Sequence, residues 1–168
     1  MMGQLSESKK GRITPEMREV AKEEGLAPEF IRDNLAQGEI IIPKNVKHSL
    51  TCCKAIGKKT KTKVNTNIGT STDYADVDHE LKKLRVAIEA GTDAVMDLST
   101  AGDLDKIRRS ILRACPFPLG TVPIYQAVIE SIAKEGALIK MKKEWKSLIW
   151  ICGRHMRRYL TDVDWITK

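Results

Sequence analysis

The sequence has few aromatic residues, no long hydrophobic run and no Cys-x-x-Cys motif. Aromatic residues make up 5% of the 168 residues, which is little for a protein that binds nucleic acid by base stacking. No stretch approaches the ~18–20 apolar residues that a transmembrane helix requires. No hydrophobic segment follows the first charged residues, so we expect no secretory signal. These absences predict a cytoplasmic protein whose four cysteines are reduced thiols.

The cysteines and histidines are spaced unlike a metal site. Cys52 and Cys53 are adjacent, and the other two cysteines are isolated. The three histidines are dispersed along the chain. Zinc and iron–sulfur sites usually take ligands from closely spaced cysteine pairs or clusters. We therefore predict that this chain does not hold a metal ion by itself. The remaining residues of these two types are Cys115, Cys152, His48, His79 and His155.

The chain is basic, with 29 Lys and Arg against 22 Asp and Glu and a net charge of +7. The densest basic run spans residues 54–63. An exposed loop or a lysine-protected edge strand is the simplest interpretation of this run, and contact with phosphate groups is the alternative. A basic nucleic-acid-binding protein is a weaker alternative, because only the net charge supports it.

The sequence pattern of residues 1–60 predicts a small α+β segment of two helices and a short strand. A threonine followed by proline at Thr14 is typical of a helix start, and Gly25 is typical of its end. A second helix is expected over 29–37, followed by a short β-branched strand at 40–42.

Residues 61–144 alternate short strands and amphipathic helices. Strands are expected at 63–65, 93–98 and 120–123, and helices over 76–90, 103–115 and 124–135. Three successive strand–turn–helix units predict a parallel sheet built from βαβ units. The pattern suits either a barrel or a doubly wound sheet. A closed eight-fold (β/α) barrel usually needs ~250 residues, so this chain is too short for a complete one.

The carboxyl ends of the expected strands carry the candidate binding residues, because ligand sites of α/β proteins lie there. Asn67, Met96 and Tyr125 fall at or just past these ends, in steps of 29 residues. An amide, a thioether and a phenol suit a polar, partly aromatic small molecule. Structural alternatives stay open: Asn67 as a turn former, Met96 as core filling and Tyr125 as a packing residue. Asp97 and Ser99 are equally suited to capping loop amides.

Six segments of the chain form a recognisable set in a fixed order. They are residues 11–17, 31–33, 41–45, 64–69, 95–100 and 120–126. Together they resemble the N-terminal part of phosphomethylpyrimidine synthase, the ThiC family of thiamine biosynthesis. The resemblance covers roughly residues 11–143, and the shorter, archaeal-type members are the most similar.

The resemblance implies a TIM-type (β/α) barrel, of which this chain would hold about three βα units. It implies conversion of 5-aminoimidazole ribonucleotide to 4-amino-5-hydroxymethyl-2-methylpyrimidine phosphate by radical chemistry. The family uses S-adenosylmethionine, a [4Fe–4S] cluster and zinc, and it forms homodimers. Its substrate contacts correspond to Asn67, Met96 and Tyr125.

The departures from the family concern its later residues. The substrate-binding histidine, phosphate-binding residues, zinc ligands and cluster cysteines have no counterpart in this sequence. We therefore expect a truncated synthase that retains part of the substrate site and lacks its cofactor ligands. A non-catalytic fragment, which binds a ribonucleotide or pairs with another subunit, is the alternative.

Residues 145–168 differ in composition from the rest of the chain, since all three tryptophans lie there. One hypothesis is that this segment is read out of frame from a disrupted gene. The other is an amphipathic helix over 145–159 that covers exposed barrel strands.

Overall fold

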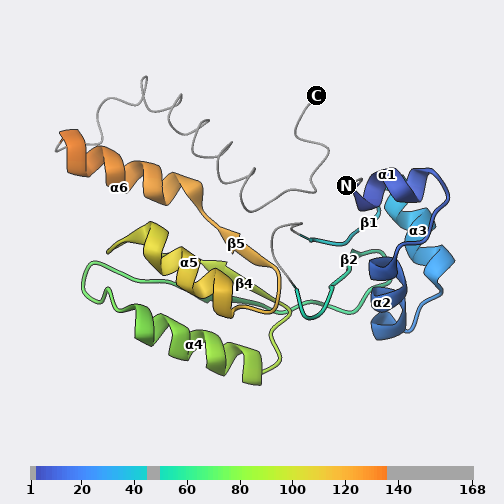
Figure 1. Ribbon diagram of the computed structural model, residues 1–168, viewed down its shortest axis with the longest axis horizontal. Helices are drawn as coiled ribbons and strands as arrows, with labels where there is room; N and C mark the ends of the chain where they lie inside the picture. The colour runs from blue at the N-terminus through green and yellow to red at the C-terminus, as the bar shows by residue number, and fades with distance from the viewer. Residues whose placement is uncertain (1–2, 45–49, 136–168) are drawn as a thin grey trace. The chain divides into compact units, whose positions relative to one another are not determined.

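The computed structural model describes residues 3–44 and 50–135 (Figure 1). They divide into two compact units, which we treat separately. The N-terminal unit comprises residues 3–63 with 116–118, and the βα unit comprises 64–115 with 119–135. Among the helices described, none has the length and apolar character needed to cross a membrane.

The N-terminal unit contains three helices and a pair of antiparallel strands. These elements are α1 (Gln4–Lys9), α2 (Pro15–Glu24), α3 (Pro28–Gln37), β1 (Ile40–Ile41) and β2 (Ile56–Gly57). The two predicted helices and the predicted strand are confirmed. Helix α1 and strand β2 were not expected, because neither has a strong local pattern: α1 is a single short polar helix, and β2 is two residues long.

Helix α2 shows why the local prediction was successful. The side-chain oxygen of Thr14 accepts a hydrogen bond from the backbone of Met17 (3.2 Å), which caps the helix. Gly25 ends the helix in the left-handed conformation, with φ of 71°. Between these ends, Met17 and Val20 are fully buried and pack with Ile31 of α3 and Ile40 of β1 in one apolar core.

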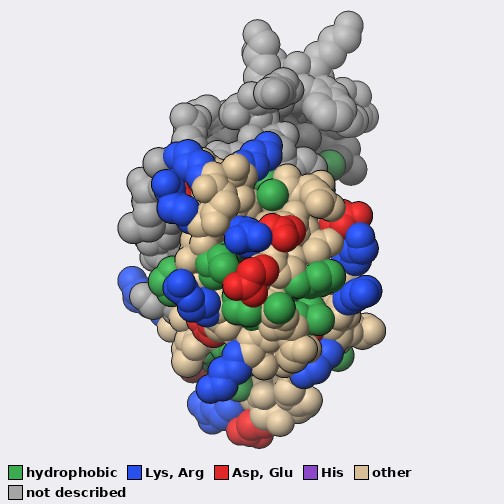
Figure 2. Space-filling view, turned by 90° about the vertical axis from the view of Figure 1, so that its right-hand side faces the viewer, with side chains coloured by type: hydrophobic (Ala, Val, Ile, Leu, Met, Phe, Trp, Pro, Cys, Tyr) green, Lys and Arg blue, Asp and Glu red, His purple; other side chains and the backbone are tan. Residues whose placement is uncertain are grey.

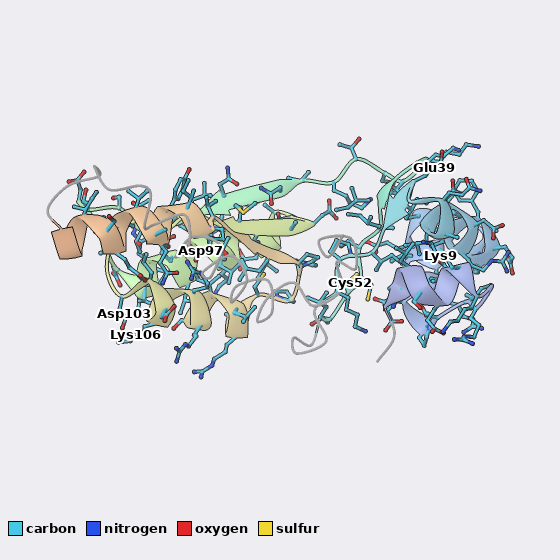
Figure 3. The ribbon with its side chains drawn as sticks, turned by 90° about the horizontal axis from the view of Figure 1, so that it is seen from above. Lys9, Glu39, Cys52, Asp97, Asp103 and Lys106 are labelled. Carbon is cyan, nitrogen blue, oxygen red and sulfur yellow. The ribbon has the colours of Figure 1, made fainter. Side chains whose placement is uncertain are left out.

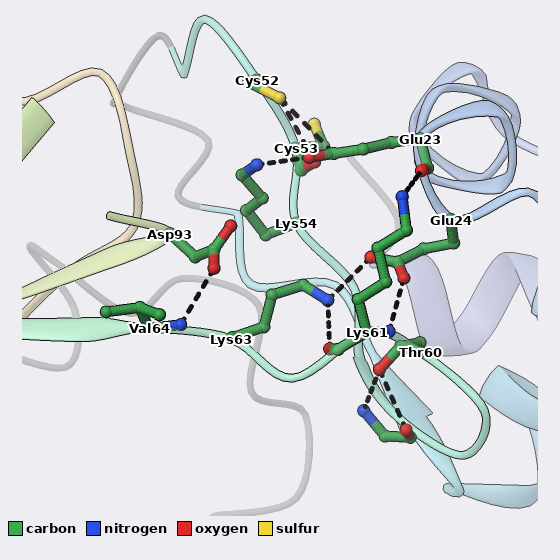
Figure 4. Close-up of polar contacts among 11 residues, drawn as sticks. Glu23, Glu24, Cys52, Cys53, Lys54, Thr60, Lys61, Lys63, Val64 and Asp93 are labelled. Atoms are coloured by element: carbon green, nitrogen blue, oxygen red, sulfur yellow. Dashed lines mark hydrogen bonds and ion pairs between the residues drawn. The ribbon is translucent and has the colours of Figure 1, made fainter. Parts of the chain in front are cut away.

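The basic run at 54–63 is tied to the acidic end of α2 (Figure 4). Lys54 forms an ion pair with Glu23, and Lys63 Nζ lies 2.7 Å from Glu24 Oε1. The backbone of Lys61 also donates to Glu24 Oε2 (2.7 Å). Burial raises the pKa of Glu24, but the hydrogen bonds from Lys63 and Lys61 outweigh it and lower that pKa.

The expectation of an exposed basic loop is thus wrong for Lys54 and Lys63, whose side chains are largely covered. The physical reason is that each ammonium group meets a carboxylate of α2, which offsets the cost of burying the charge. Figure 2 shows one face of the molecule, where Lys and Arg side chains are spread out with acidic side chains among them.

The βα unit alternates strands and helices, as predicted. Its elements are β3 (Asn65–Ile68), α4 (Val77–Glu89), β4 (Ala94–Asp97), α5 (Leu104–Ala114), β5 (Leu119–Thr121) and α6 (Pro123–Glu135). The strands form one parallel sheet in the order β3-β4-β5. Together with β1 and β2, the described chain is a mixed α/β structure, and its strands do not close into a barrel.

The first predicted strand of this unit is misplaced. The strand was expected at 63–65 and a polar turn from Thr66, but β3 runs to Ile68. Pairing with β4, from Asn65 with Ala94 to Ile68 with Asp97, provides the backbone partners for these residues. The asparagines had indicated a turn; in the structure they lie on the face of the strand that is less covered.

The 3.6-residue pattern predicted the buried stripe of α5 fully and that of α4 in part, since Val77, Leu81 and Ile88 of α4 are only half-buried. Leu84 of α4 is buried, as are Leu104, Ile107 and Ile111 of α5. Asp103 caps α5, because its carboxylate accepts a hydrogen bond from the backbone of Lys106 (3.0 Å); both residues are labelled in Figure 3. These helices cover one side of the sheet, so its two faces differ in character.

Candidate functional site

The two faces of the parallel sheet carry different residues, because side chains alternate along a strand. One face carries Ile68, Val95 and Asp97, which are all buried. The opposite face carries Asn67, which is exposed, and Met96, which is half-buried. The predicted substrate contacts of β3 and β4 therefore lie on the face of the sheet that is less covered by the described helices.

Asn67 and Met96 are direct neighbours in the sheet. They pair in register between β3 and β4, and Met96 pairs in turn with Gly120 of β5. A Cβ atom at Gly120 would lie 2.8 Å from the sulfur of Met96, so the glycine gives the thioether its space. The Asn67 side-chain oxygen accepts a hydrogen bond from Asn65 Nδ2 (2.9 Å). The structure thus brings two of the three predicted residues together.

Tyr125 lies elsewhere than the 29-residue step implied. The neighbour of Met96 on β5 is Gly120, and Tyr125 is the third residue of α6. Its backbone donates to Val122 O (3.1 Å), at the turn between β5 and α6. The side chain is 39% exposed, so it is not a packed core residue. Tyr125 therefore follows a strand end, as predicted, although it is not in register with the other two residues.

The loop that follows β3 is held closely by its neighbours. Gly69 has φ of 153°, and a Cβ atom there would lie 2.6 Å from the backbone of Leu98 and of Ser99. Its backbone donates to Glu80 Oε2 (2.7 Å), a fully buried carboxylate of α4 that also forms an ion pair with Lys83. The backbone of Leu98 and Ser99 and the carboxylate of Glu80 together hold Gly69, two residues after Asn67, in place.

Asp97 and Ser99 cap loop amides, which confirms one of the structural alternatives. Asp97 Oδ1 accepts hydrogen bonds from the backbone (3.0 Å) and the hydroxyl (2.5 Å) of Ser99. The Ser99 hydroxyl oxygen accepts a further hydrogen bond from the backbone of Thr70 (3.1 Å). The loops after β3 and β4 are thus linked to each other at the carboxyl end of the sheet.

Sequence reasoning missed Arg108, a buried residue on the sheet side of α5. Its Nε lies 3.6 Å from Asp97 Oδ2, and its Nη1 donates to Gln126 Oε1 of α6 (2.9 Å). A signal existed, because position 108 falls on the apolar stripe formed by Leu104 and Ile111. A charged residue on such a stripe needs a buried partner.

The cysteines of the described chain do not assemble a metal site. Cys52 and Cys53 belong to the N-terminal unit and Cys115 to the βα unit. Burial, together with the charge of Glu19, raises the pKa of Cys53 to about 11, which disfavours the thiolate that metals bind. No group of three or more His, Cys, Asp or Glu side chains suited to a metal ion occurs among residues 3–44 and 50–135.

The histidines contribute no ligand cluster either within these ranges. His79 makes an edge contact with the ring of Tyr74, with ring centroids 4.8 Å apart. The remaining cysteine and histidines of the sequence lie outside the described residues: His48, Cys152 and His155.

Comparison with known proteins gives a consistent result. Residues 3–164 match the model of the radical SAM ThiC family. The chain is 50% identical over 144 residues to the phosphomethylpyrimidine synthase of Thermoanaerobacter sp. (strain X514), covering 86% of this chain and 33% of that protein. The corresponding enzyme of Desulforamulus reducens is 46% identical over 166 residues, 99% of this chain and 37% of that protein.

An archaeal relative gives the same picture. Phosphomethylpyrimidine synthase 1 of Methanothermobacter thermautotrophicus is 50% identical over 143 residues, 85% of this chain and 33% of that protein. The chain thus spans about a third of the length of the curated relatives it matches. The family match covers nearly the whole chain and includes most of residues 145–168. This chain belongs to the radical SAM ThiC family.

Proposed function

We propose that this chain forms part of a binding site for 5-aminoimidazole ribonucleotide in the synthesis of the thiamine pyrimidine. The supporting observation is that Asn67 and Met96 are paired neighbours on the open face of a parallel sheet. Tyr125 lies in the first turn of α6, the helix that follows the third strand of this sheet. Ligand sites of parallel α/β sheets lie at this end of the strands.

Each side chain has a distinct task in this proposal. The Asn67 amide offers both a donor and an acceptor to the aminoimidazole nitrogens. The Met96 thioether packs against the face of the ring, since sulfur makes favourable contacts with aromatic systems. The exposed Tyr125 phenol supplies a second hydrogen bond. These three groups bind and orient the nucleotide.

The wider architecture belongs to the same proposal. The three βα units would form one side of a TIM-type (β/α) barrel, whose remaining strands come from outside the described residues. The open face of the sheet and the strictly parallel order β3-β4-β5 are consistent with this arrangement. The cytoplasmic location and the homodimer implied by the family are further parts of it.

The family's cofactors do not fit the residues that the structure describes. A [4Fe–4S] cluster requires converging thiolates, and the three described cysteines are split between the two units. Burial raises the pKa of two of them, Cys52 and Cys53. The same residues contain no zinc ligand set. S-Adenosylmethionine chemistry therefore needs protein groups outside this part of the chain, and we assign the described residues to substrate binding alone.

Calorimetry with 5-aminoimidazole ribonucleotide tests the proposal on the whole chain. We expect saturable binding at one site per chain. Asn67→Ala and Tyr125→Phe should each weaken binding about five- to tenfold, the usual effect of losing one hydrogen bond. Tyr74→Phe is the matched control, because Tyr74 is also an exposed tyrosine of the βα unit and should not change the affinity. Absence of binding, or equal affinities in all four proteins, would refute the proposal.

A non-catalytic ribonucleotide-binding fragment is the second candidate function. The pairing of Asn67 with Met96 favours this alternative, because these side chains can contact a nucleotide whether or not a cluster is present. Anaerobic reconstitution with iron and sulfide separates the two candidates. A stoichiometric [4Fe–4S] cluster on this chain would support the synthase, whereas binding of the nucleotide without a cluster would support the fragment.

A further inference from the structure

We propose that Asp97 and Arg108 are positioning residues, which form a buried network behind the sheet and hold the substrate contacts in fixed relative places. The contacts concerned are Asn67, Met96 and Tyr125. The effect on substrate binding rests on the proposed function. The coupling between the three positions is a property of the ligand-free chain and can be tested separately.

Asp97 is the centre of this network. It follows Met96 in β4, so its side chain points to the opposite face of the sheet, toward Arg108 of α5, and it is 2% exposed. Figure 3 labels its position in the βα unit. Its Oδ1 accepts two hydrogen bonds from Ser99. Its Oδ2 has no hydrogen-bond partner within the described residues and lies 3.6 Å from Arg108 Nε. One carboxylate thus faces a loop on one side and a helix on the other.

The Oδ1 side of the network reaches β3. The Ser99 hydroxyl oxygen accepts a hydrogen bond from the backbone of Thr70, and Thr100 donates its backbone N–H to Thr70 O (2.9 Å). Thr70 lies three residues after Asn67. The loop after β3, which follows Asn67, is therefore hydrogen-bonded to the loop after β4, which follows Met96.

The Oδ2 side of the network reaches α6. Arg108 Nη1 donates to Gln126 Oε1 (2.9 Å), and Gln126 Nε2 donates to Glu130 Oε1 (2.9 Å). Gln126 directly follows Tyr125. The planar guanidinium can face a carboxylate and an amide at once, which the single ammonium of a lysine cannot do with the same geometry. Arg108 therefore places the first turn of α6, with Tyr125, relative to the end of β4.

Stability alone does not account for this arrangement. An apolar pair of similar volume commonly stabilises a core as well as a buried ion pair does, because burying two charges carries a desolvation cost. The polar network adds a defined geometry, because hydrogen bonds restrict the distances and angles between the groups they join more than apolar contacts do. Fixed geometry matters where several groups must contact one ligand together.

Nuclear magnetic resonance of the ligand-free chain tests the coupling. We expect Arg108→Lys to shift the Met96 methyl, the Tyr125 ring and the Thr70 amide together. Arg109→Lys is the matched control: Arg109 is the next residue of α5, and its side chain is 57% exposed, against 3% for Arg108. It should leave the three resonances unchanged. Unchanged resonances in Arg108→Lys, or equal shifts in both variants, would overturn the inference.

A second variant keeps the test decisive if Arg108→Lys does not fold. Ser99→Ala removes the acceptor of the Thr70 amide and a donor to Asp97 while leaving the Arg108 contacts in place. We expect it to shift the Thr70 and Met96 resonances more than those of Tyr125. The reverse order, or no shift, would contradict the network.

Substrate affinity then separates this inference from the proposed function. Arg108→Lys should weaken binding of 5-aminoimidazole ribonucleotide about tenfold. Ile111→Val, a buried change on the same helix, should lower the thermal stability and leave the affinity unchanged. Equal affinities in parent and Arg108→Lys would overturn the positioning role. If the parent does not bind at all, the proposed function fails, and the ligand-free resonances still decide whether the network couples the three positions.

Discussion

The two units place their charged groups differently. In the N-terminal unit the central core is apolar, with Met17 and Ile31 fully buried. Buried charges occur there too, but one partner of each ion pair keeps some contact with solvent: Lys63 opposite Glu24 is 12% exposed, and Glu23 opposite Lys54 is 32% exposed. In the βα unit, both members of an ion pair are buried. Glu80 is fully buried there, and Asp97 and Arg108 are each 2% exposed.

The difference follows from what each unit must hold in place. In the N-terminal unit the helices pack through an apolar core, and two carboxylates of α2, Glu19 and Glu24, bind loop amides at its edge. In the βα unit, irregular loops after each strand leave backbone amides without partners in regular structure, and buried polar side chains satisfy them. Gly69 and Thr70 are the clearest cases, bound by Glu80 and Ser99. Both units thus bind loop amides through carboxylates, and among the described residues it is the βα unit in which a buried ion pair links a strand to two helices.

The largest expected effect tests whether each unit depends on its own core. Ile31 of α3 and Ile111 of α5 are both fully buried. Ile31→Ala and Ile111→Ala should each cost about 2–5 kcal/mol, since each removes apolar volume and leaves a cavity. Urea denaturation measures the loss in the free energy of unfolding, and amide hydrogen exchange locates it.

We expect the loss of protection to fall first in the unit that carries the substitution. Equal loss of protection in α2 and α5 from either substitution alone would mean that one cooperative structure spans both units. The comparison between the two units would then no longer hold.

The next largest effect tests how tightly the loop after β3 is packed. Gly69→Ala forces a Cβ atom to within 2.6 Å of backbone atoms of β4's loop, and about 1–3 kcal/mol of stability should be lost. Gly91→Ala is the matched control, because Gly91 also has a positive φ, 84°, but nothing lies within 4 Å of its added Cβ. Its cost should be about 1 kcal/mol, from the left-handed backbone alone. Thermal unfolding followed by circular dichroism measures both; equal losses would contradict the tight packing of the Gly69 loop.

The smallest expected effect is a loss of stability of the N-terminal unit at low pH, through protonation of Glu16. Burial raises the pKa of Glu16, but the hydrogen bonds from Lys44 and Gln4 outweigh it and lower that pKa from 4.5 to about 2. Because the folded pKa lies below the unfolded value, the stabilisation is complete above about pH 4.5. It is lost as the pH falls from 4.5 towards 2, by about 1–2 kcal/mol after allowance for solvent screening.

Glu16→Gln should remove this part of the pH dependence, which urea denaturation at several pH values measures. Glu29→Gln is the control, since Glu29 also lies in the first turn of a helix but is exposed. If the stability of Glu16→Gln still falls between pH 4.5 and 2 as much as that of the parent, the Lys44 ion pair does not stabilise the folded state.

Local signals predicted most of the elements. The caps at Thr14 and Asp103 and the glycines that end α2 and α3 placed the helix bounds within a residue or two. The same signals misplaced β3, because Asn67 has a turn-forming side chain and its strand is identified only by pairing with β4. Helix α1 and strand β2 were missed because neither has a periodic pattern.

For the site, the sequence identified residues but not their geometry. The carboxyl-end rule and the family resemblance together selected Asn67, Met96 and Tyr125. Only the strand register showed that the 29-residue step holds from Asn67 to Met96 but not from Met96 to Tyr125, because the neighbour of Met96 on β5 is Gly120. Arg108 was not recognised, because an arginine next to another arginine in a basic helix resembles a surface residue.

The sequence by itself determined the order of strands and helices, the apolar stripes and the family, since each of these depends on residue types and short-range spacing. Only the tertiary structure decided which groups meet across long separations in the chain. The contacts of Glu80 with Gly69 and of Arg108 with Asp97 and Gln126 are of this kind. The physical reason is that buried polar groups find partners according to strand register and helix packing, which no local pattern of residues encodes.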